Sequence, residues 1–195
     1  NARIYTPIDD GKPLAGNEMG YVAVTEEGAL IVEEGYIASI GQEREILGSL
    51  PSGEEVEEID LEGRCIIPGF VDPHTHACFM GTREREFVMR LQGASYLDIL
   101  KMGGGILSTV DKVRSASKEE LYENTKEVVS RAAKSGITTI EIKSGYGLSL
   151  EHEIKMLEVI DQLNGNPLDV VPTFMGAHAI PMEYKDNPKA YVELV

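Results

Sequence analysis

Two histidines separated by a single residue, His74 and His76, are the side chains in this sequence best suited to chemistry. Alternate residues of a β-strand point to the same side, so both imidazoles can reach one metal ion at about 2 Å. In an arbitrary sequence, such a pair is more often two hydrogen-bonded structural histidines. Here the pair follows the apolar run 65–71, and the active sites of α/β barrels lie at the carboxyl ends of their strands. This position favours a metal site.

Arg83 and Tyr146 are two polar side chains whose sequence surroundings are compatible with either a binding or a purely structural role. Arg83 comes seven residues after His76, in the segment leaving the predicted strand, where its planar guanidinium could pair with a carboxylate through two hydrogen bonds. Its position alone favours an exposed or salt-bridged arginine. Tyr146 stands between Gly145 and Gly147, which allow the backbone to turn a phenol into a pocket. An aromatic ring that only packs on the loop is the other interpretation.

His178 follows another apolar run, 168–175, and so also stands at the end of a predicted strand. It could serve as a third metal ligand or polarise a substrate carbonyl, and its spacing does not decide between these roles. His152, by contrast, lies inside a helical pattern between two glutamates, where a solvated histidine is expected. His152 is therefore left out of the predicted site.

Residues 1–64 have the pattern of a small β domain. Its β-rich runs are 21–24, 29–32 and 36–40, separated by acidic, glycine-containing turns. Gly35 supplies the positive φ that a tight hairpin needs, so the last two runs should pair with each other. A Pro-Ser-Gly stretch at 51–53, with the acidic run after it, is expected to be a linker.

From residue 65 onward, the pattern changes to alternating strands and helices. The apolar run 65–71 is expected to be a strand covered on both faces. The elements expected after it are a helix from the Ser117–Glu120 capping box to Gly136, a strand over 137–142, a helix capped by Ser149 with Leu150, Ile154 and Leu157 inward, and a strand over 168–175. This order predicts an α/β fold with a parallel sheet, either open and doubly wound or a (β/α)8 TIM-like barrel. A complete barrel takes about 250 residues, so residues 65–195 would form only its first half.

Several motifs, in order, resemble one known family. The segment 68–76, after a small β unit, resembles the first barrel strand of the amidohydrolase superfamily. Further segments are similar to the imidazolonepropionases, the amidohydrolases of histidine degradation: 81–87, 91–96, 103–109, 141–147 and 174–181. The succession of motifs is more specific than any one of them, and it resembles the N-terminal portion of that family. Residues 1–60 match the family's β domain only loosely, as a small β-sandwich-like domain.

The resemblance implies which residues carry the activity. His74 and His76 would bind one zinc or iron ion per complete active site. Arg83, Tyr146 and His178 would bind the substrate, 4-imidazolone-5-propanoate. His178 would also be catalytic, because it would stabilise the negative charge that develops on the ring carbonyl oxygen.

The reaction implied by the resemblance is metal-dependent hydrolysis of a cyclic amide. Water activated on the metal would attack the ring carbonyl and open the C–N bond to give N-formimidoyl-L-glutamate. Lys143 stands where some amidohydrolases carry a modified lysine that bridges two metals, but the family resembled argues for one metal. In the family resembled, the remaining metal ligands and acid–base groups come from later strands, which would lie beyond Val195. The 195 residues alone are therefore expected neither to hydrolyse the substrate nor to hold metal tightly.

The composition excludes some classes of partner. The net charge is −15, from 33 acidic and 18 basic residues, which disfavours nucleic acid because no basic patch exists to displace counterions. The acidic run 54–58 is expected to be a solvated loop. No apolar run approaches the ~18 residues of a membrane span, so no membrane association is expected. Two cysteines, Cys65 and Cys78, suggest no disulfide framework and fit a reducing cytoplasm. The resemblance implies a homodimer for the full-length protein.

Two other classes of function remain open from the sequence. One is a different amidohydrolase, a deaminase or a dihydropyrimidinase-like enzyme, which shares the histidine pair but does not need Arg83, Tyr146 and the run 176–178 together. The other is a non-catalytic, metal-free homologue with a binding or scaffold role. The substrate preference and metal content of the full-length protein would distinguish these.

Overall fold

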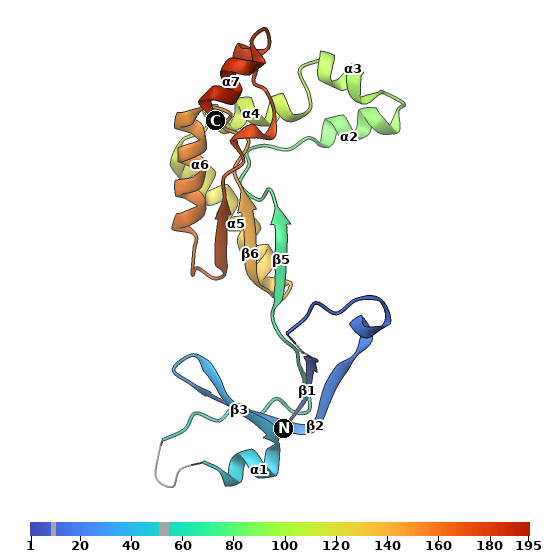
Figure 1. Cartoon of the computed structure of the whole chain (residues 1–195), viewed down its shortest axis with the longest axis vertical. Coiled ribbons are helices and arrows are strands. Elements are labelled where there is room, and N and C mark those ends of the chain that lie inside the picture. Colours follow the sequence, from blue (N-terminus) through green and yellow to red (C-terminus); the bar gives the residue numbers. More distant parts are fainter. Residues whose placement is uncertain (9–10, 51–54) are drawn as a thin grey trace. The chain divides into compact units, whose positions relative to one another are not determined.

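The structure, a computed structural model, describes residues 1–8, 11–50 and 55–195. These residues fall into two units, Asn1–Pro68 and Gly69–Val195, which Figure 1 shows in chain colours. The division expected from the sequence, between residues 64 and 65, lies slightly before this boundary. The first unit consists of strands with little helix, and the second alternates strands with helices.

The first unit contains a four-stranded sheet in the order β3-β2-β1-β4. Its elements are β1 (Ala2–Pro7), η1 (Gly16–Gly20), β2 (Val22–Glu33), β3 (Tyr36–Gln42), α1 (Glu43–Gly48) and β4 (Cys65–Ile66). β2 pairs antiparallel with both β1 and β3, as expected for a small antiparallel unit, whereas β4 pairs parallel with β1. The residues described for this unit form one sheet layer, and a β-sandwich needs two.

The hairpin predicted around Gly35 is confirmed. Val32 pairs with Ile37, and Glu33 with Tyr36, across the turn between β2 and β3. Glu34 has φ 51° and Gly35 has φ 84°, so both central residues are left-handed, as a tight two-residue hairpin turn requires.

The separate strands predicted over 21–24 and 29–32 are wrong, because a single long strand, β2, spans both. The acidic residues between them do not end the strand. Instead, the register with β1 shifts, and Glu27 takes φ 46° within the irregularity. A Cβ at Gly28 would lie 2.8 Å from Cδ1 of the buried Ile4, so a larger residue there would require Ile4 to shift.

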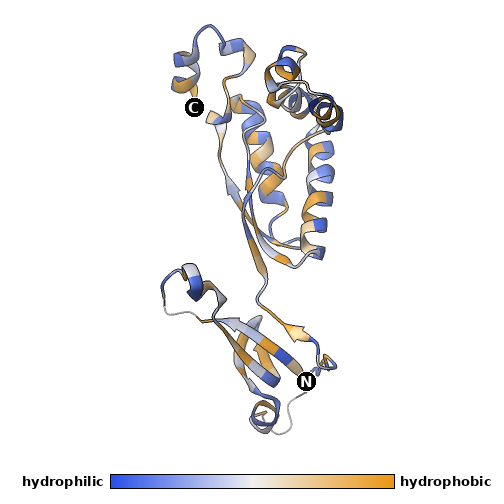
Figure 2. Ribbon diagram, turned by 90° about the vertical axis from the view of Figure 1, so that its right-hand side faces the viewer, coloured by the Kyte–Doolittle hydropathy of each residue, from blue (hydrophilic) through white to orange (hydrophobic). Residues whose placement is uncertain are grey.

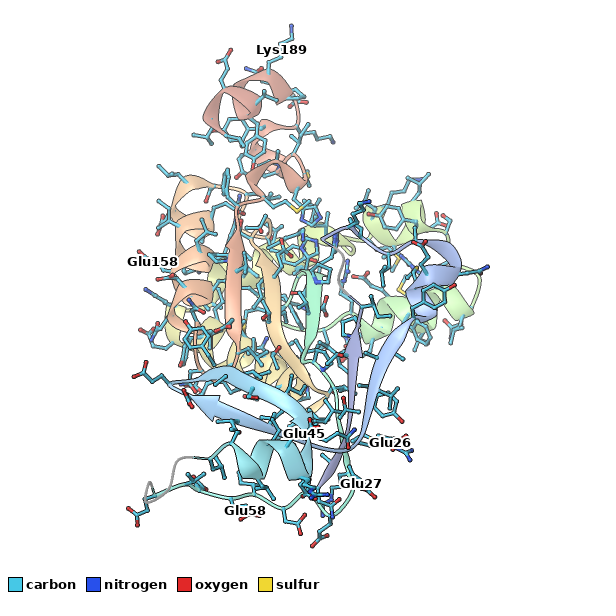
Figure 3. All side chains as sticks on the ribbon, turned by 60° about the horizontal axis from the view of Figure 1, so that its bottom comes forward. Glu26, Glu27, Glu45, Glu58, Glu158 and Lys189 are labelled. Carbon is cyan, nitrogen blue, oxygen red and sulfur yellow. The ribbon has the colours of Figure 1, made fainter. Side chains whose placement is uncertain are left out.

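The acidic excess lies on the surface of the described residues. Figure 3 labels Glu26, Glu27, Glu45 and Glu58 of the first unit and Glu158 of the second, all with exposed side chains. Residues 55–58 are exposed and carry no regular structure, as expected for the acidic run. The predicted linker 51–53 lies outside the described residues.

The second unit is built on a parallel sheet in the order β5-β6-β7, which confirms the α/β prediction. Its elements are β5 (Phe70–Thr75), α2 (Glu84–Leu91), α3 (Tyr96–Lys101), α4 (Ile106–Ser115), α5 (Lys118–Lys134), β6 (Ile137–Lys143), α6 (Leu150–Gln162), β7 (Asp169–Thr173), η2 (Gly176–His178), η3 (Met182–Tyr184) and α7 (Pro188–Leu194) (Figure 1). In Figure 2, α5 and α6 alternate hydrophobic and hydrophilic residues, as expected for helices packed against a sheet. None of the helices in the described part of the chain is long and apolar enough to cross a membrane.

The capping box predicted at Ser117 is confirmed. Ser117 Oγ accepts a hydrogen bond from the N–H of Glu120, and the Glu120 carboxylate accepts one from the N–H of Ser117. From this start, α5 buries Leu121, Thr125 and Val129. The helix ends before Gly136, which has φ 89°.

The apolar run 65–71 is not the single buried strand that was predicted. Residues 65–66 form β4 in the first unit, and β5 begins at Phe70 in the second. Pro68 has no N–H to give to a ladder, and a Cβ at Gly69 would collide with Thr138. β5 is also an edge strand, with Phe70 53% and Val71 63% exposed, because β6 is its only partner among the described strands.

The inward face of α6 was also predicted wrongly. Leu150 and Ile154 are exposed, at 67% and 45%, and Leu157 is only partly buried. The residues that α6 buries are Glu153, Met156, Val159 and Ile160. The apolar pattern misled because one inward position holds a carboxylate, which finds backbone N–H partners in the loop before the helix.

Candidate active site

His74 and His76 lie at the carboxyl end of β5, the first in the strand and the second just after it. Their ring centroids are 6.0 Å apart, at an interplanar angle of 67°. The residue between them fixes the pair to β6. Thr75 Oγ1 donates to the carbonyl of Glu141 at 2.6 Å, and the Thr75 N–H donates to the Glu141 carboxylate at 3.2 Å.

Tyr146 comes from the loop after β6 and stands against both His76 and His178, with ring centroids 5.5 and 5.4 Å away. The expectation that glycine turns this phenol inward agrees with the backbone. Gly145 has φ 102°, and a Cβ there would lie 2.9 Å from the carbonyl oxygen of Met175. The loop can therefore approach the segment after β7 closely only with glycine at this position.

His178 lies at the end of η2, after β7, and stacks on His76 with ring centroids 4.8 Å apart. Its Nδ1 is 3.0 Å from the carbonyl oxygen of Gly145. Because a carbonyl can only accept, Nδ1 carries a proton and Nε2 is the nitrogen left for a ligand. The turn is anchored from behind, since Tyr191 Oη donates to the carbonyl of Gly176 at 2.5 Å.

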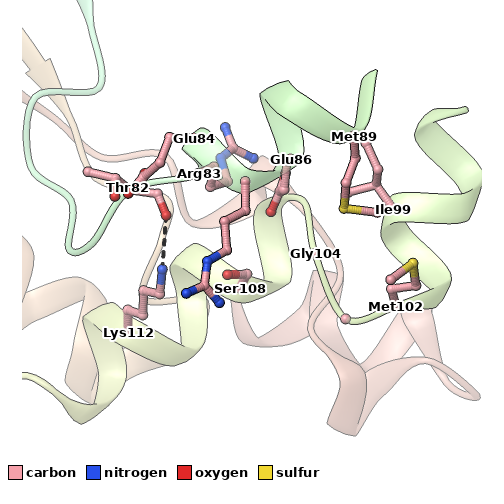
Figure 4. Close-up of a pocket in the computed structure, with 12 residues that line it drawn as sticks. Thr82, Arg83, Glu84, Glu86, Met89, Ile99, Met102, Gly104, Ser108 and Lys112 are labelled. Atoms are coloured by element: carbon pink, nitrogen blue, oxygen red, sulfur yellow. Dashed lines mark hydrogen bonds between the residues drawn. The ribbon is translucent and has the colours of Figure 1, made fainter. Parts of the chain in front are cut away.

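Arg83 is exposed and occupies the N-cap position of α2. It lines a surface cavity of about 610 Å³, together with Ser108 and Lys112 of α4 (Figure 4). Lys112 Nζ donates to the Thr82 carbonyl at 3.0 Å and so ties the segment to α4. None of the four rings above lines this cavity. The structure thus gathers the four rings, whereas Arg83 lines a surface cavity that none of them lines.

The surroundings of His76 and Tyr146 favour the neutral form of both side chains. Burial, followed by the charges of His178, Lys143 and His74, lowers the pKa of His76, which keeps its imidazole neutral near pH 7. Burial raises the pKa of Tyr146 against the opposing charge of Arg83, so its phenol stays a hydrogen-bond donor.

The histidine pair fits a metal, although the described residues do not complete a site. His76 Nδ1 is buried and has no hydrogen-bond partner in the described structure, so an imidazole nitrogen is left available. No group of three His, Cys, Asp or Glu side chains within the described ranges could hold an ion. Lys143 donates to the Glu141 carboxylate, an ion pair that gives no support to a metal-bridging lysine.

Glu153 is the residue that sequence reasoning missed. It is only 4% exposed, and its carboxylate accepts from backbone N–H groups of the Tyr146 loop. The neighbouring His152 is partly buried rather than solvated, with Nδ1 2.8 Å from Ser149 Oγ. A stripe at i, i+3 and i+7 from Glu153 reaches Met156 and Ile160, and that spacing could have indicated its inward orientation.

The comparison with protein families assigns the chain. The model described as "Amidohydrolase family" matches residues 65–164, which are 100 of the 195 residues and include β5, β6 and the histidine pair. The chain belongs to the amidohydrolase family. The match begins where the sequence pattern changes from short strands to alternating strands and helices.

Relatives within the amidohydrolases confirm the resemblance to imidazolonepropionases. The chain is 53% identical to the imidazolonepropionase of Syntrophobacter fumaroxidans, over 100% of this chain and 46% of that protein. It is 50% identical to that of Desulfotalea psychrophila, over 100% and 47%, and 47% identical to that of a Geobacillus species, over 94% and 44%. The chain spans just under half the length of these relatives.

A solved amidohydrolase-type structure supports the fold. Guanine deaminase from E. coli superposes with a TM-score of 0.52, over 88% of this chain and 36% of that one, at 17% sequence identity. At that identity the likeness concerns the fold alone. The two chains thus share a fold over the superposed region.

Proposed function

We propose that the protein containing this chain hydrolyses 4-imidazolone-5-propanoate to N-formimidoyl-L-glutamate, the step of histidine degradation implied by the motifs. The observation that carries the proposal is the cluster of His74, His76, Tyr146 and His178 rings at the carboxyl ends of three parallel strands. The relatives named imidazolonepropionase, at 47–53% identity, support this substrate over other cyclic amides.

The architecture proposed for the whole protein is a (β/α)8 barrel of the amidohydrolase type with a small β-sandwich-like domain. Residues 65–195 would supply the first half of the barrel, and residues 1–64 part of the β domain. The parallel order β5-β6-β7 supports a barrel, since both edges of this sheet lack a strand partner among the described residues. The exposed edge at Phe70 and Val71 is where a closing strand would pair.

His74 and His76 would hold one zinc or iron ion, with further ligands from outside this chain. When bound, the ion activates water and polarises the ring carbonyl. The neutral state of His76 and its unpartnered nitrogen support this role. Thr75 would keep the two imidazoles in place through its bonds to Glu141.

The other residues of the chain would bind and orient the substrate. Arg83 would pair with the propanoate carboxylate, and the Tyr146 phenol would donate to the bound ring. His178 would act as catalyst in its imidazolium form: Nδ1 would donate to the Gly145 carbonyl, and Nε2 would donate to the ring carbonyl oxygen as negative charge develops there. Opening the C–N bond consumes one water: the carbonyl carbon becomes a carboxylate, and the released ring nitrogen becomes the imino end of the formimidoyl group, which stays on the other ring nitrogen.

The protein acts on a small molecule in this proposal, as its relatives' names suggest. We further propose that it works as a homodimer in the cytoplasm, without nucleic-acid or membrane partners. The strongly acidic surface supports the first of these exclusions. Sedimentation of the full-length protein would test the dimer directly.

The substrate is tested by assaying a full-length protein that carries this chain against four compounds: 4-imidazolone-5-propanoate, guanine, cytosine and hydantoin, with metal content measured on the same sample. The expected result is turnover of the imidazolone alone and about one zinc or iron per chain. Preferential turnover of guanine, cytosine or hydantoin would assign a different amidohydrolase. A folded, metal-free protein with no turnover would assign a non-catalytic homologue.

A further inference from the structure

The loop that carries Tyr146 is held from beneath by one buried carboxylate. Glu153, near the start of α6, accepts from the N–H groups of Gly147 and Leu148 at 2.8 Å each. The N–H of Gly145 reaches both carboxylate oxygens, at 3.0 and 3.2 Å. Three backbone donors of one short loop therefore converge on a side chain that is 4% exposed.

The carbonyl side of the same loop is held by a cation. Arg114 Nε donates to the carbonyl of Gly147 at 2.7 Å, and its Nη2 donates to that of Leu148 at 2.9 Å. Glu183 fixes this guanidinium through a 2.8 Å contact to Nη2. The loop is thus fixed by an anion on its N–H side and a cation on its carbonyl side.

The position of this loop determines two side chains of the proposed site. Tyr146 lies inside it, and the Gly145 carbonyl accepts a hydrogen bond from Nδ1 of His178. Gly147 leaves no room for adjustment towards α6, because a Cβ there would lie 2.5 Å from the backbone nitrogen of Glu153. A shift of the loop would therefore move the phenol and the imidazole together.

A buried carboxylate costs free energy unless hydrogen bonds replace its lost water. Here three N–H donors point at the Glu153 oxygens, so the hydrogen bonds need the charged form, in which both oxygens only accept. Among the described residues, the hydrogen bonds to the Glu153 side chain all come from backbone N–H groups. It also lies in the first turns of α6, where the helix dipole favours an anion. Glutamine has the same shape, but its NH2 group would face a backbone donor.

We propose that Glu153 is a positioning residue for the hydrolytic site: its carboxylate fixes the 145–148 backbone so that Tyr146 and His178 meet the substrate in one geometry. The inference rests on the proposed function for its effect on catalysis. Its structural part, that Glu153 holds the loop, does not depend on the substrate.

The test compares Glu153→Gln with Glu151→Gln in the full-length protein. Glu151 is an exposed glutamate in the same turn of α6, so it is a matched control for charge and helix position. The measurements are kcat and KM with 4-imidazolone-5-propanoate, metal bound per chain, and amide hydrogen exchange at Gly145, Gly147 and Leu148. A third variant, Arg114→Lys, loosens the carbonyl side and covers the case in which Glu153→Gln fails to fold.

The expected result for Glu153→Gln is a fall in kcat per bound metal of about 10- to 100-fold, as for a misplaced catalytic group, with little change in KM or metal content. Exchange at the three amides should accelerate, whereas Glu151→Gln should match the wild type in every measurement. Arg114→Lys should lower kcat in the same direction by a smaller factor.

Two results would overturn the proposal: wild-type kcat per metal in Glu153→Gln, or equal losses in Glu153→Gln and Glu151→Gln. If Glu153→Gln does not fold, wild-type kcat in Arg114→Lys would do the same. If the wild type does not turn over the imidazolone, the proposed function fails separately. Amide exchange then still decides whether Glu153 holds the loop, and unchanged exchange in Glu153→Gln would refute that part.

Discussion

The segments that follow β5 and β6 are held in place differently, although both start at the carboxyl ends of parallel strands. The loop after β6 is fixed by Glu153 and Arg114, and it presents a half-buried Tyr146. The segment after β5 is anchored at its root by Thr75, but it carries Arg83 on an exposed helix start. We infer that the first side is organised before substrate arrives, whereas Arg83 is ordered by the substrate itself. Losses on the two sides should therefore appear in different kinetic constants.

The largest effect is expected at the root of the β5 segment, where His74 and His76 stand. In the full-length protein, replacing both with alanine should lower turnover by more than about 10³-fold, because the metal supplies several kcal/mol of transition-state stabilisation. Metal analysis of the same preparation should show little bound zinc or iron. Wild-type metal content in the double variant would show that the pair does not bind the ion.

The next largest loss of turnover is expected from replacing His178 or Tyr146, the side chains whose positions depend on the 145–148 loop. His178→Ala should lower kcat by roughly 10²- to 10³-fold, as loss of an oxyanion donor does, with the bound metal unchanged. Tyr146→Phe should lower it less, by about fivefold, since one net hydrogen bond of about 1 kcal/mol is lost. Steady-state kinetics measure both. A rise in KM without a change in kcat for either variant would contradict the inference that these side chains are held in place before substrate binds.

Arg83 should behave in the opposite way. Arg83→Lys keeps the charge but loses two-point contact with a carboxylate, so KM should rise about 10- to 100-fold while kcat changes little. The control is the unsubstituted imidazolone, which lacks the propanoate and should be indifferent to the variant. Equal effects on both compounds would show that Arg83 does not bind the carboxylate.

The smallest expected effect is on the reactivity of Cys78, a buried thiol in the segment that follows β5. Burial raises the pKa of Cys78 to about 12, so its reactive thiolate is scarce at neutral and mildly alkaline pH. Cys65 in the first unit is exposed. An aromatic disulfide reagent at about pH 8 should label Cys65 in the native chain and both thiols after denaturation. Rapid native labelling of Cys78 would show that the root of the segment opens.

Local signals account for the parts of the fold that the sequence predicted. The Ser117–Glu120 capping box and the two left-handed residues at Glu34 and Gly35 are determined by neighbours in the chain, so helix start and hairpin were predicted correctly. The split of the run 65–71 depends on which strands it pairs with, and pairing partners are distant in sequence. Periodicity alone could not show it.

The site was predictable to the extent that motifs carry it. His74, His76, Tyr146 and His178 come together because parallel strands end at one edge. Glu153 was missed because a glutamate on an amphipathic helix is ordinarily on the solvent side, and only the loop N–H groups explain its burial. Sequence patterns name groups that meet a substrate more readily than groups that hold those groups in place.

The ring cluster is proposed to belong to a metal-dependent site that acts on 4-imidazolone-5-propanoate. The most direct measurement is the rate at which a full-length protein carrying this chain consumes that compound before chelation, after chelation, and after zinc or iron is restored. We expect the turnover to disappear when the metal is removed and to return when it is restored. In the protein that carries both His74→Ala and His76→Ala, restoring the metal should not bring turnover back. Undiminished turnover in the metal-free protein would contradict it.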